Sequence, residues 1–197
     1  MQSSGKSCIE LIVGLGNPGP QYAAHRHNVG AWFVDILARS HDINLRVEPK
    51  LHGKIGRLST PQQSCWLFIP TTYMNESGRA VRAVAEFYKI AASSILVAHD
   101  ELDFTAGIVR LKQNGGHGGH NGLRDIITQL QSSDFLRLRL GIGHPGHRDK
   151  VHDYVLSQPS NSDCDLILKA IDEGLQVLPD LLQGNIEQAI QQLHSES

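Results

Sequence analysis

Five polar side chains stand at the ends of apolar segments or in the loops that follow them: Asn17, His27, Asn75, Asp100 and Asn121. Together they offer one imidazole, one carboxylate and three neutral amides. An imidazole supported by a carboxylate can take a proton from water, and amide N–H groups can hold a substrate and stabilise an oxyanion. These groups therefore indicate base-assisted attack of water on a carbonyl, with no covalent nucleophile.

Each of these residues also has a purely structural interpretation. Asn17 and Asn121 suit turns, Asn75 suits a helix cap, and Asp100 suits a capping carboxylate after a strand. Taken one at a time, the structural role is the commoner one for these residue types. The chemical hypothesis therefore requires a fold that brings all five side chains to one place.

A dinucleotide site is the first competing hypothesis. Residues 14–19 (GLGNPG) follow an apolar segment with the spacing G-x-G-x-x-G. However, Pro18 and Pro20 remove amide donors from the loop that would hold a pyrophosphate, and Asp35 lies inside an amphipathic helical segment. This context does not favour a nicotinamide-dependent or flavin-dependent oxidoreductase, and we expect no cofactor.

A catalytic metal is the second competing hypothesis, because the chain has eleven histidines. None of them belongs to an H-E-x-x-H motif or to a Cys or carboxylate cluster with metal-ligand spacing. We therefore predict no metal site and expect most histidines to be loop or surface residues. Three close pairs occur: His25 and His27, His117 and His120, and His144 and His147.

The composition excludes several classes of protein. With 40% hydrophobic residues, the 197-residue chain can form a core. Its net charge of −2 argues against a protein that binds nucleic acid through a basic surface all around, although a local basic patch stays possible. Three cysteines without a CxxC pair indicate reduced thiols of the cytosol. Because no segment approaches about 20 consecutive apolar residues, we expect a cytoplasmic protein without membrane contact.

Strand and helix patterns alternate along the chain. We predict strands at 8–15, 65–70, 95–98, 108–111 and 135–142, and helices at 29–37, 79–88, 123–130, 165–182 and 186–193, with Asn28 as the first N-cap. This order predicts an α/β fold: one three-layer domain over 1–197, with a twisted, mostly parallel or mixed sheet and helices on both faces. Residues 1–7 are expected to be a flexible extension. Sites in such folds lie outside the carboxyl ends of strands.

Several ordered motifs resemble those of the bacterial peptidyl-tRNA hydrolase family. They stand at 14–19 (GLGNPG), 26–28 (RHN), 70–78 (PTTYMNESG), 97–103 (VAHDELD), 115–122 (GGHGGHNG) and 137–145 (RLRLGIGHP). The resemblance implies a monomeric α/β enzyme. It also implies cleavage of the ester between a peptide and the terminal ribose of tRNA, which frees tRNAs from peptides dropped by ribosomes. Gln113 and Asn114 depart from a more glycine-rich entry to the histidine loop.

The same resemblance implies a role for each matching residue. His27 matches the catalytic base, Asp100 the acid that supports it, and Asn17 the residue that helps to select N-blocked substrates. Basic residues that clamp a phosphate would position the RNA without reading its bases. The positions that contact the tRNA end or the peptide are Tyr22, Tyr73, Asn75 and Asn121, and those of the phosphate clamp are Lys112 and Arg139.

A non-catalytic RNA-binding module with the same groove is a third hypothesis, from a different class of function. The presence of His27, Asp100 and all three asparagines argues against it. The expected partner is the 3′ acceptor end of peptidyl-tRNA, and a turnover assay on an N-blocked aminoacyl-tRNA separates the two functions.

Overall fold

The computed structural model describes residues 8–61 and 63–195. A seven-stranded mixed sheet runs through it in the order β2-β3-β4-β1-β5-β7-β6. The strands are β1 (Leu11–Gly14), β2 (Arg46–Glu48), β3 (Gly53–Ser59), β4 (Ser64–Pro70), β5 (Ile95–Glu101), β6 (Val109–Gln113) and β7 (Leu136–Gly141). The expected flexible extension, residues 1–7, lies outside the described residues.

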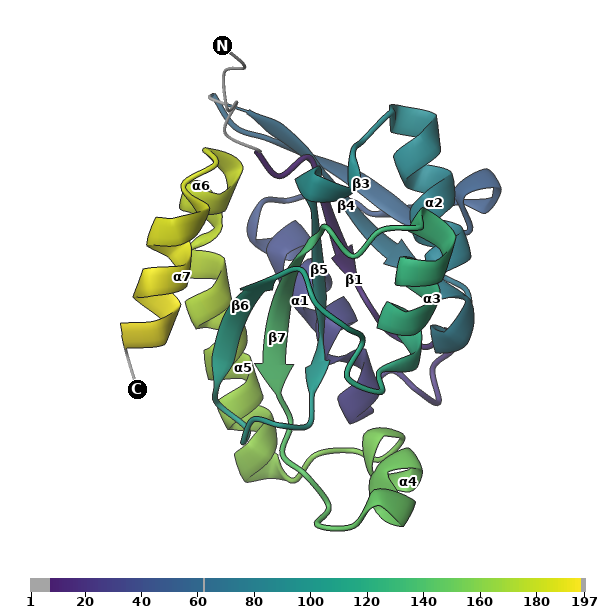
Figure 1. The fold of residues 1–197 in the computed structure, drawn as a ribbon, viewed down its shortest axis with the longest axis vertical. Helices are drawn as coiled ribbons and strands as arrows, with labels where there is room; N and C mark the ends of the chain where they lie inside the picture. Colours follow the sequence, from purple (N-terminus) through teal and green to yellow (C-terminus); the bar gives the residue numbers. More distant parts are fainter. Residues whose placement is uncertain (1–7, 62, 196–197) are drawn as a thin grey trace.

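Helices cover both faces of the sheet (Figure 1). They are α1 (Val29–Ser40), α2 (Ser77–Tyr88), α3 (Asn121–Leu130), α4 (Val151–Val155), α5 (Asn161–Gln176), α6 (Leu178–Leu182) and α7 (Ile186–Ser195). One apolar cluster joins the sheet to α1 and α5 through Phe33, Leu138 and Ile171, and a second joins it to α2 and α3 through Val81 and Ile126. The predicted three-layer α/β fold with a mixed sheet is therefore confirmed.

The four central strands β4, β1, β5 and β7 are parallel, whereas β2, β3 and β6 pair antiparallel at the edges. Because parallel strands end at the same edge of a sheet, the loops after β1 and β4 and the end of β5 meet there. In Figure 1 the arrowheads of β5 and β7 point towards α4, which lies beyond this edge. The polar residues that the sequence places after strands therefore gather at one end of the molecule.

Close packing explains Gly14, the first glycine of the GLGNPG segment, and Gly30 in the first turn of α1. A Cβ atom at Gly30 would overlap the backbone oxygen of Ala98 in β5, and one at Gly14 would overlap the backbone oxygen of Gly30. Two glycines thus let the start of α1 touch both β1 and β5. This contact places the 3₁₀ turn η1 (Arg26–Asn28), which precedes α1, over the carboxyl end of β5.

Three parts of the fold differ from the sequence prediction. Strands β2 and β3 and the short helix α4 were not predicted, because these segments are half exposed and have no strong apolar period. The predicted helix over 165–182 is two helices, α5 and α6, since Pro179 begins a new first turn. No helix of residues 8–61 and 63–195 is long and apolar enough to cross a membrane.

Candidate active site

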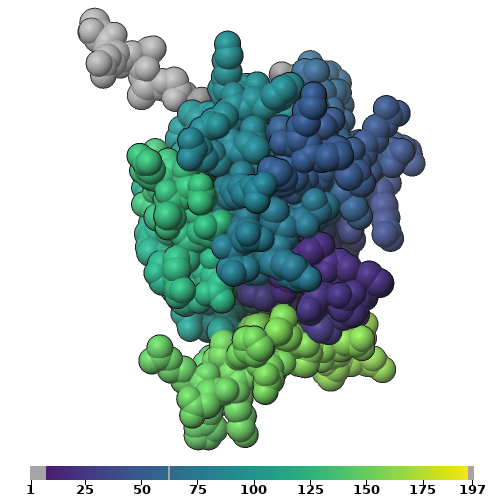
Figure 2. All heavy atoms as spheres, turned by 90° about the vertical axis from the view of Figure 1, so that its right-hand side faces the viewer, coloured from purple at the N-terminus to yellow at the C-terminus, as the bar shows by residue number. Residues whose placement is uncertain are grey.

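A cleft of about 990 Å³ opens at the carboxyl edge of the parallel strands. All nine residues predicted for the site line it: Asn17, Tyr22, His27, Tyr73, Asn75, Asp100, Lys112, Asn121 and Arg139. In Figure 2 the segment that carries α4 projects beneath the face formed by α2 and α3, and the loop after β1 lies beside it. The fold thus brings together residues from the whole length of the chain, as the chemical hypothesis requires.

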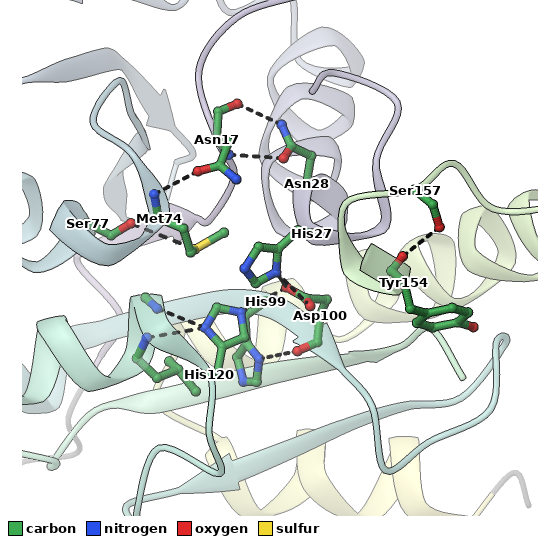
Figure 3. Close-up of polar contacts among 12 residues, drawn as sticks. Asn17, His27, Asn28, Met74, Ser77, His99, Asp100, His120, Tyr154 and Ser157 are labelled. Atoms are coloured by element: carbon green, nitrogen blue, oxygen red, sulfur yellow. Dashed lines mark hydrogen bonds and ion pairs between the residues drawn. The ribbon is translucent and has the colours of Figure 1, made fainter. Parts of the chain in front are cut away.

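Two histidines share the Asp100 carboxylate at the base of the cleft. Nδ1 of His27 lies 2.9 Å from both oxygens of Asp100, and Nε2 of His120 lies 2.8 Å from Oδ1. Asp100 is 4% exposed, so it depends on these protein donors rather than on water. Figure 3 shows both imidazole rings joined to this carboxylate.

The N-terminus of α3 fixes the tautomer of His120. His120 is the N-cap of α3, and its Nδ1 accepts hydrogen bonds from the backbone N–H groups of Gly122 (3.1 Å) and Leu123 (3.3 Å). Its proton therefore sits on Nε2, which donates to Asp100. His27 likewise donates from Nδ1, which leaves its Nε2 as the nitrogen that faces the cleft.

Burial and charge have opposite effects on the pKa values of His27 and Asp100. Burial alone would raise the pKa of Asp100, but the attraction of His27 and His120 and their hydrogen bonds hold that pKa well below its ordinary value. Burial likewise lowers the pKa of His27, yet the charge and hydrogen bond of Asp100 outweigh it, and the pKa of His27 is raised. Asp100 is therefore a carboxylate over the whole physiological pH range.

A third histidine, His99, lies beneath the pair. Its Nδ1 donates to the backbone oxygen of Asp100 at 2.7 Å, and its Nε2 has no partner among the described residues. Burial, together with the nearby His120, lowers the pKa of His99 to about 3. His99 is therefore neutral under physiological conditions and adds no charge beneath Asp100.

Asn17 is held from three sides (Figure 3). Asn28 bonds to both its backbone N–H (3.0 Å) and its backbone oxygen (2.9 Å), and the N–H of Met74 donates to Asn17 Oδ1 at 2.8 Å. The expectation that Asn28 caps α1 is corrected here: it occupies the cap position, but its side chain makes no cap bond. Because Oδ1 of Asn17 is engaged, the Nδ2 donors are left to face the cleft.

Arg26, next to His27, holds the far wall of the cleft. Its guanidinium donates to Ser157 Oγ (2.8 Å) and to the backbone oxygen of Gln158 (2.6 Å), and it lies 4.2 Å from the centre of the Tyr154 ring. These contacts fix the end of α4 against η1. In the motif RHN, therefore, the first residue secures the wall, the second faces Asp100, and the third fixes Asn17.

Basic side chains also line the cleft. Lys112 is exposed, and Arg139 forms a 2.9 Å ion pair with Glu101 and lies over the Phe104 ring. A phosphate bound here would have to share Arg139 with Glu101. Arg124 and Arg148 line the same cleft and were not predicted.

His120 is the main residue that sequence reasoning missed. Most histidines were expected to be loop or surface residues, yet His120 donates to Asp100 and caps α3. The signal was its place directly before a helical segment, in the position where an N-cap stands. Together with His27 and Asp100, it forms a group whose ligand atoms lie within 4.8 Å of one another. Here Asp100 is joined to both imidazoles by hydrogen bonds.

Comparisons with known proteins agree with this geometry. Residues 11–197 match the sequence family described as peptidyl-tRNA hydrolase. The chain belongs to the peptidyl-tRNA hydrolase family. It is 57% identical over 187 residues to the peptidyl-tRNA hydrolase of Coxiella burnetii, covering 95% of this chain and 98% of that one. It is also 54% identical over 186 residues to the peptidyl-tRNA hydrolase of Methylococcus capsulatus, and this match covers 94% of this chain and 99% of that one.

The solved structures of the peptidyl-tRNA hydrolase family include a close match in fold. The crystal structure of peptidyl-tRNA hydrolase from Acinetobacter baumannii superposes with a TM-score of 0.93, at 48% identity over 96% of each chain. The family resemblance read from the motifs is therefore confirmed.

The substitution Asp100→Asn tests the electrostatics of the pair. It should lower the pKa of His27 to below its ordinary value, because the burial that disfavours the imidazolium then acts without the opposing carboxylate. An NMR titration of the imidazole nitrogens measures this shift. His99 is the internal control and should stay neutral. An unchanged pKa of His27 would show that Asp100 is not its dominant partner.

Proposed function

We propose that this protein hydrolyses peptidyl-tRNA, with His27 as the general base that activates water. The observation that carries the proposal is the hydrogen bond between His27 Nδ1 and Asp100 inside the cleft. It orients the ring so that Nε2 faces the substrate side, and it stabilises the imidazolium that forms when water loses a proton. Membership of the peptidyl-tRNA hydrolase family supports the substrate.

The reaction then runs in two proton transfers. Nε2 of His27 takes a proton from water while the water oxygen bonds to the ester carbonyl carbon. As the tetrahedral intermediate collapses, the ester bond breaks, and His27 returns the proton to the departing 3′ oxygen of the ribose. We assign the stabilisation of the oxyanion to Asn75 and the orientation of water or peptide to Asn121, both of which line the cleft.

Asn17 gives the site its selectivity for peptides. With Oδ1 bonded to Met74, its Nδ2 can donate to the carbonyl that precedes the esterified residue. An N-blocked aminoacyl group has such a carbonyl, and a free aminoacyl group does not. An unpaired buried polar group costs about 1–3 kcal/mol, so one amide both binds the peptide and discriminates.

The remaining predicted residues hold the ends of the substrate. The rings of Tyr22 and Tyr73 lie edge to face, with centroids 6.4 Å apart, and Tyr73 is 54% exposed, so it offers a face to a base or a peptide. Lys112 and Arg139, which line the same cleft, bind a phosphate of the RNA. Because residues of a single chain line the whole cleft, we propose that the protein acts as a one-domain monomer, in the cytoplasm where tRNA is used.

Substituting His27→Ala should lower kcat by roughly 10² to 10⁴-fold with little change in KM, because a general base acts in the transition state. The assay is ester cleavage of an N-acetylaminoacyl-tRNA by the full chain, with and without a chelator. His41→Ala is the matched control, since His41 lies at the end of α1 outside the cleft. Wild-type kcat in the His27 variant would remove it from the mechanism, and complete inactivity of the wild type would leave the RNA-binding module as the function.

The substitution Asn17→Asp should reduce kcat/KM for N-blocked substrates by roughly 10 to 100-fold, because it removes the Nδ2 donors while the bond from Met74 persists. Hydrolysis of unblocked aminoacyl-tRNA, measured in parallel, should change far less. Equal losses on both substrates would contradict the role in selectivity.

Replacing Lys112 or Arg139 with Ala should weaken RNA binding and flatten its salt dependence, by roughly 0.7 to 0.9 in log affinity per decade of salt for each lost phosphate contact. Titrations of a catalytically inactive protein with N-acetylaminoacyl-tRNA at several salt concentrations measure the slope. Lys169→Ala is the control, because Lys169 pairs with Glu173 on α5 and does not line the cleft. An unchanged slope would rule out the phosphate clamp.

A further inference from the structure

Arg137 is a buried arginine of β7 that the proposed mechanism does not use. It is 2% exposed, and its two terminal nitrogens donate to backbone carbonyls: one to Gly116 and the other to Gly115. Its Nε has no partner among residues 8–61 and 63–195. Buried arginines are seldom found without a paired anion. The two neighbouring carbonyls therefore take the place that an anion usually occupies.

These carbonyls belong to the glycine-rich loop of residues 114–120, which joins β6 to α3. The loop has almost no packing of its own, because a Cβ atom at Gly116, Gly118 or Gly119 would meet no atom within 4 Å. Two hydrogen bonds lie within the loop: Gly119 N–H donates to Nδ1 of His117, and His120 N–H donates to the backbone oxygen of His117. Its entry is tied to the sheet by Arg137 and by a 3.4 Å bond from Asn114 N–H to the backbone oxygen of Phe135.

The loop ends in the two residues that the active site needs. His120 donates to Asp100 and caps α3, and Asn121 follows it in the wall of the cleft. Because hydrogen bonds rather than packing define the loop, its path sets where these side chains stand. A displacement of about 1 Å is enough to lower a rate severely when reacting groups must be aligned.

We propose that Arg137 is a positioning residue: its two-pronged hydrogen bond to Gly115 and Gly116 holds the loop in the conformation in which His120 reaches Asp100 and Asn121 faces the substrate. The inference rests on the proposed function of the cleft and adds a residue to it. Arg137 acts through the loop and need not touch the substrate.

The shape of the guanidinium suits this task. Two successive carbonyl oxygens lie within reach of one planar fork, which a lysine ammonium cannot reproduce because it is a single point of charge on a flexible stem. The guanidinium is also braced, since it lies 4.8 Å from the centre of the Phe135 ring. Its terminal donors are thus fixed in direction as well as buried.

Arg137 lines the same cleft as Lys112 and Arg139, but its burial and its engaged donors distinguish it from these two residues. Lys112 pairs with Arg137 in the register of β6 and β7, but Lys112 is exposed and Arg139 is half-buried, whereas Arg137 is buried and its terminal donors are already engaged. Loss of Lys112 or Arg139 should therefore act on RNA binding and on KM. Loss of Arg137 should act on kcat, because it disturbs the alignment of His120 and Asn121.

The test compares Arg137→Met and Arg137→Lys in the full chain. We expect kcat on N-acetylaminoacyl-tRNA to fall on the order of 10 to 100-fold in the methionine variant and by less in the lysine variant, with KM within about threefold of wild type. Hydrogen exchange at the backbone amides of Gly119 and His120 should speed up by roughly tenfold or more, while exchange in β5 and β1 stays unchanged.

Arg110→Lys is the matched control. Arg110 stands on the neighbouring strand β6, and its guanidinium also donates to backbone oxygens, those of Val109 and Leu193, outside the cleft. The same change there should leave both kcat and loop exchange as in wild type. If it alters them equally, the effect of Arg137 is general destabilisation and the proposal is wrong.

Wild-type kcat and wild-type loop exchange in the Arg137 variants would overturn the proposal. If the methionine variant fails to fold, the lysine variant decides, because it keeps the positive charge and loses the fork. The exchange measurement needs no substrate. If the wild type cleaves no peptidyl-tRNA while the loop still loosens in the Arg137 variants, the proposed function is rejected and the hold of Arg137 on the loop is upheld.

Discussion

The buried carboxylate of Asp100, shared between two imidazoles, is the interaction on which the rest of the site depends. A carboxylate that is 4% exposed is costly unless it is fully hydrogen-bonded, and here His27 and His120 supply the donors. The α3 N-terminus holds His120 in place, because its Nδ1 accepts from Gly122 and Leu123 while its Nε2 donates to Asp100. One pair of charges therefore sets both the orientation and the basicity of the ring that faces the cleft.

Three sets of contacts in the fold place the side chains around Asp100. Gly30 lets α1 approach Ala98, which sets His27 over the end of β5. The motif at 26–28 then uses each residue differently, since Arg26 secures the α4 wall and Asn28 secures Asn17. On the opposite side, Arg137 and the α3 cap bring His120 to the same carboxylate. Elements far apart in the sequence thus meet at a single acid.

The periodicity of apolar residues predicted the helices and strands that are buried in the core. The apolar periods of β4, β5 and α2 were clear because these elements bury one or both faces. The edge strand β3 is half exposed and left no such period. The residue types alone indicated an imidazole, a carboxylate and three amides that could activate water. The role of each residue came from the resemblance of the motifs to the family. His120 was missed because its partner, Asp100, is close only in space, and the hold of Arg137 on a glycine loop leaves no sequence pattern at all.

The central claim is that the protonation state of His27 governs ester cleavage. The most direct measurement compares two pKa values on the same protein: that of the His27 imidazole, from an NMR titration, and that of the acidic limb of kcat/KM against pH with an N-blocked substrate. Because the base must be neutral to act and Asp100 raises its pKa, the two values should coincide above the ordinary value of histidine. An acidic limb that does not move with the titration of His27 would contradict the account.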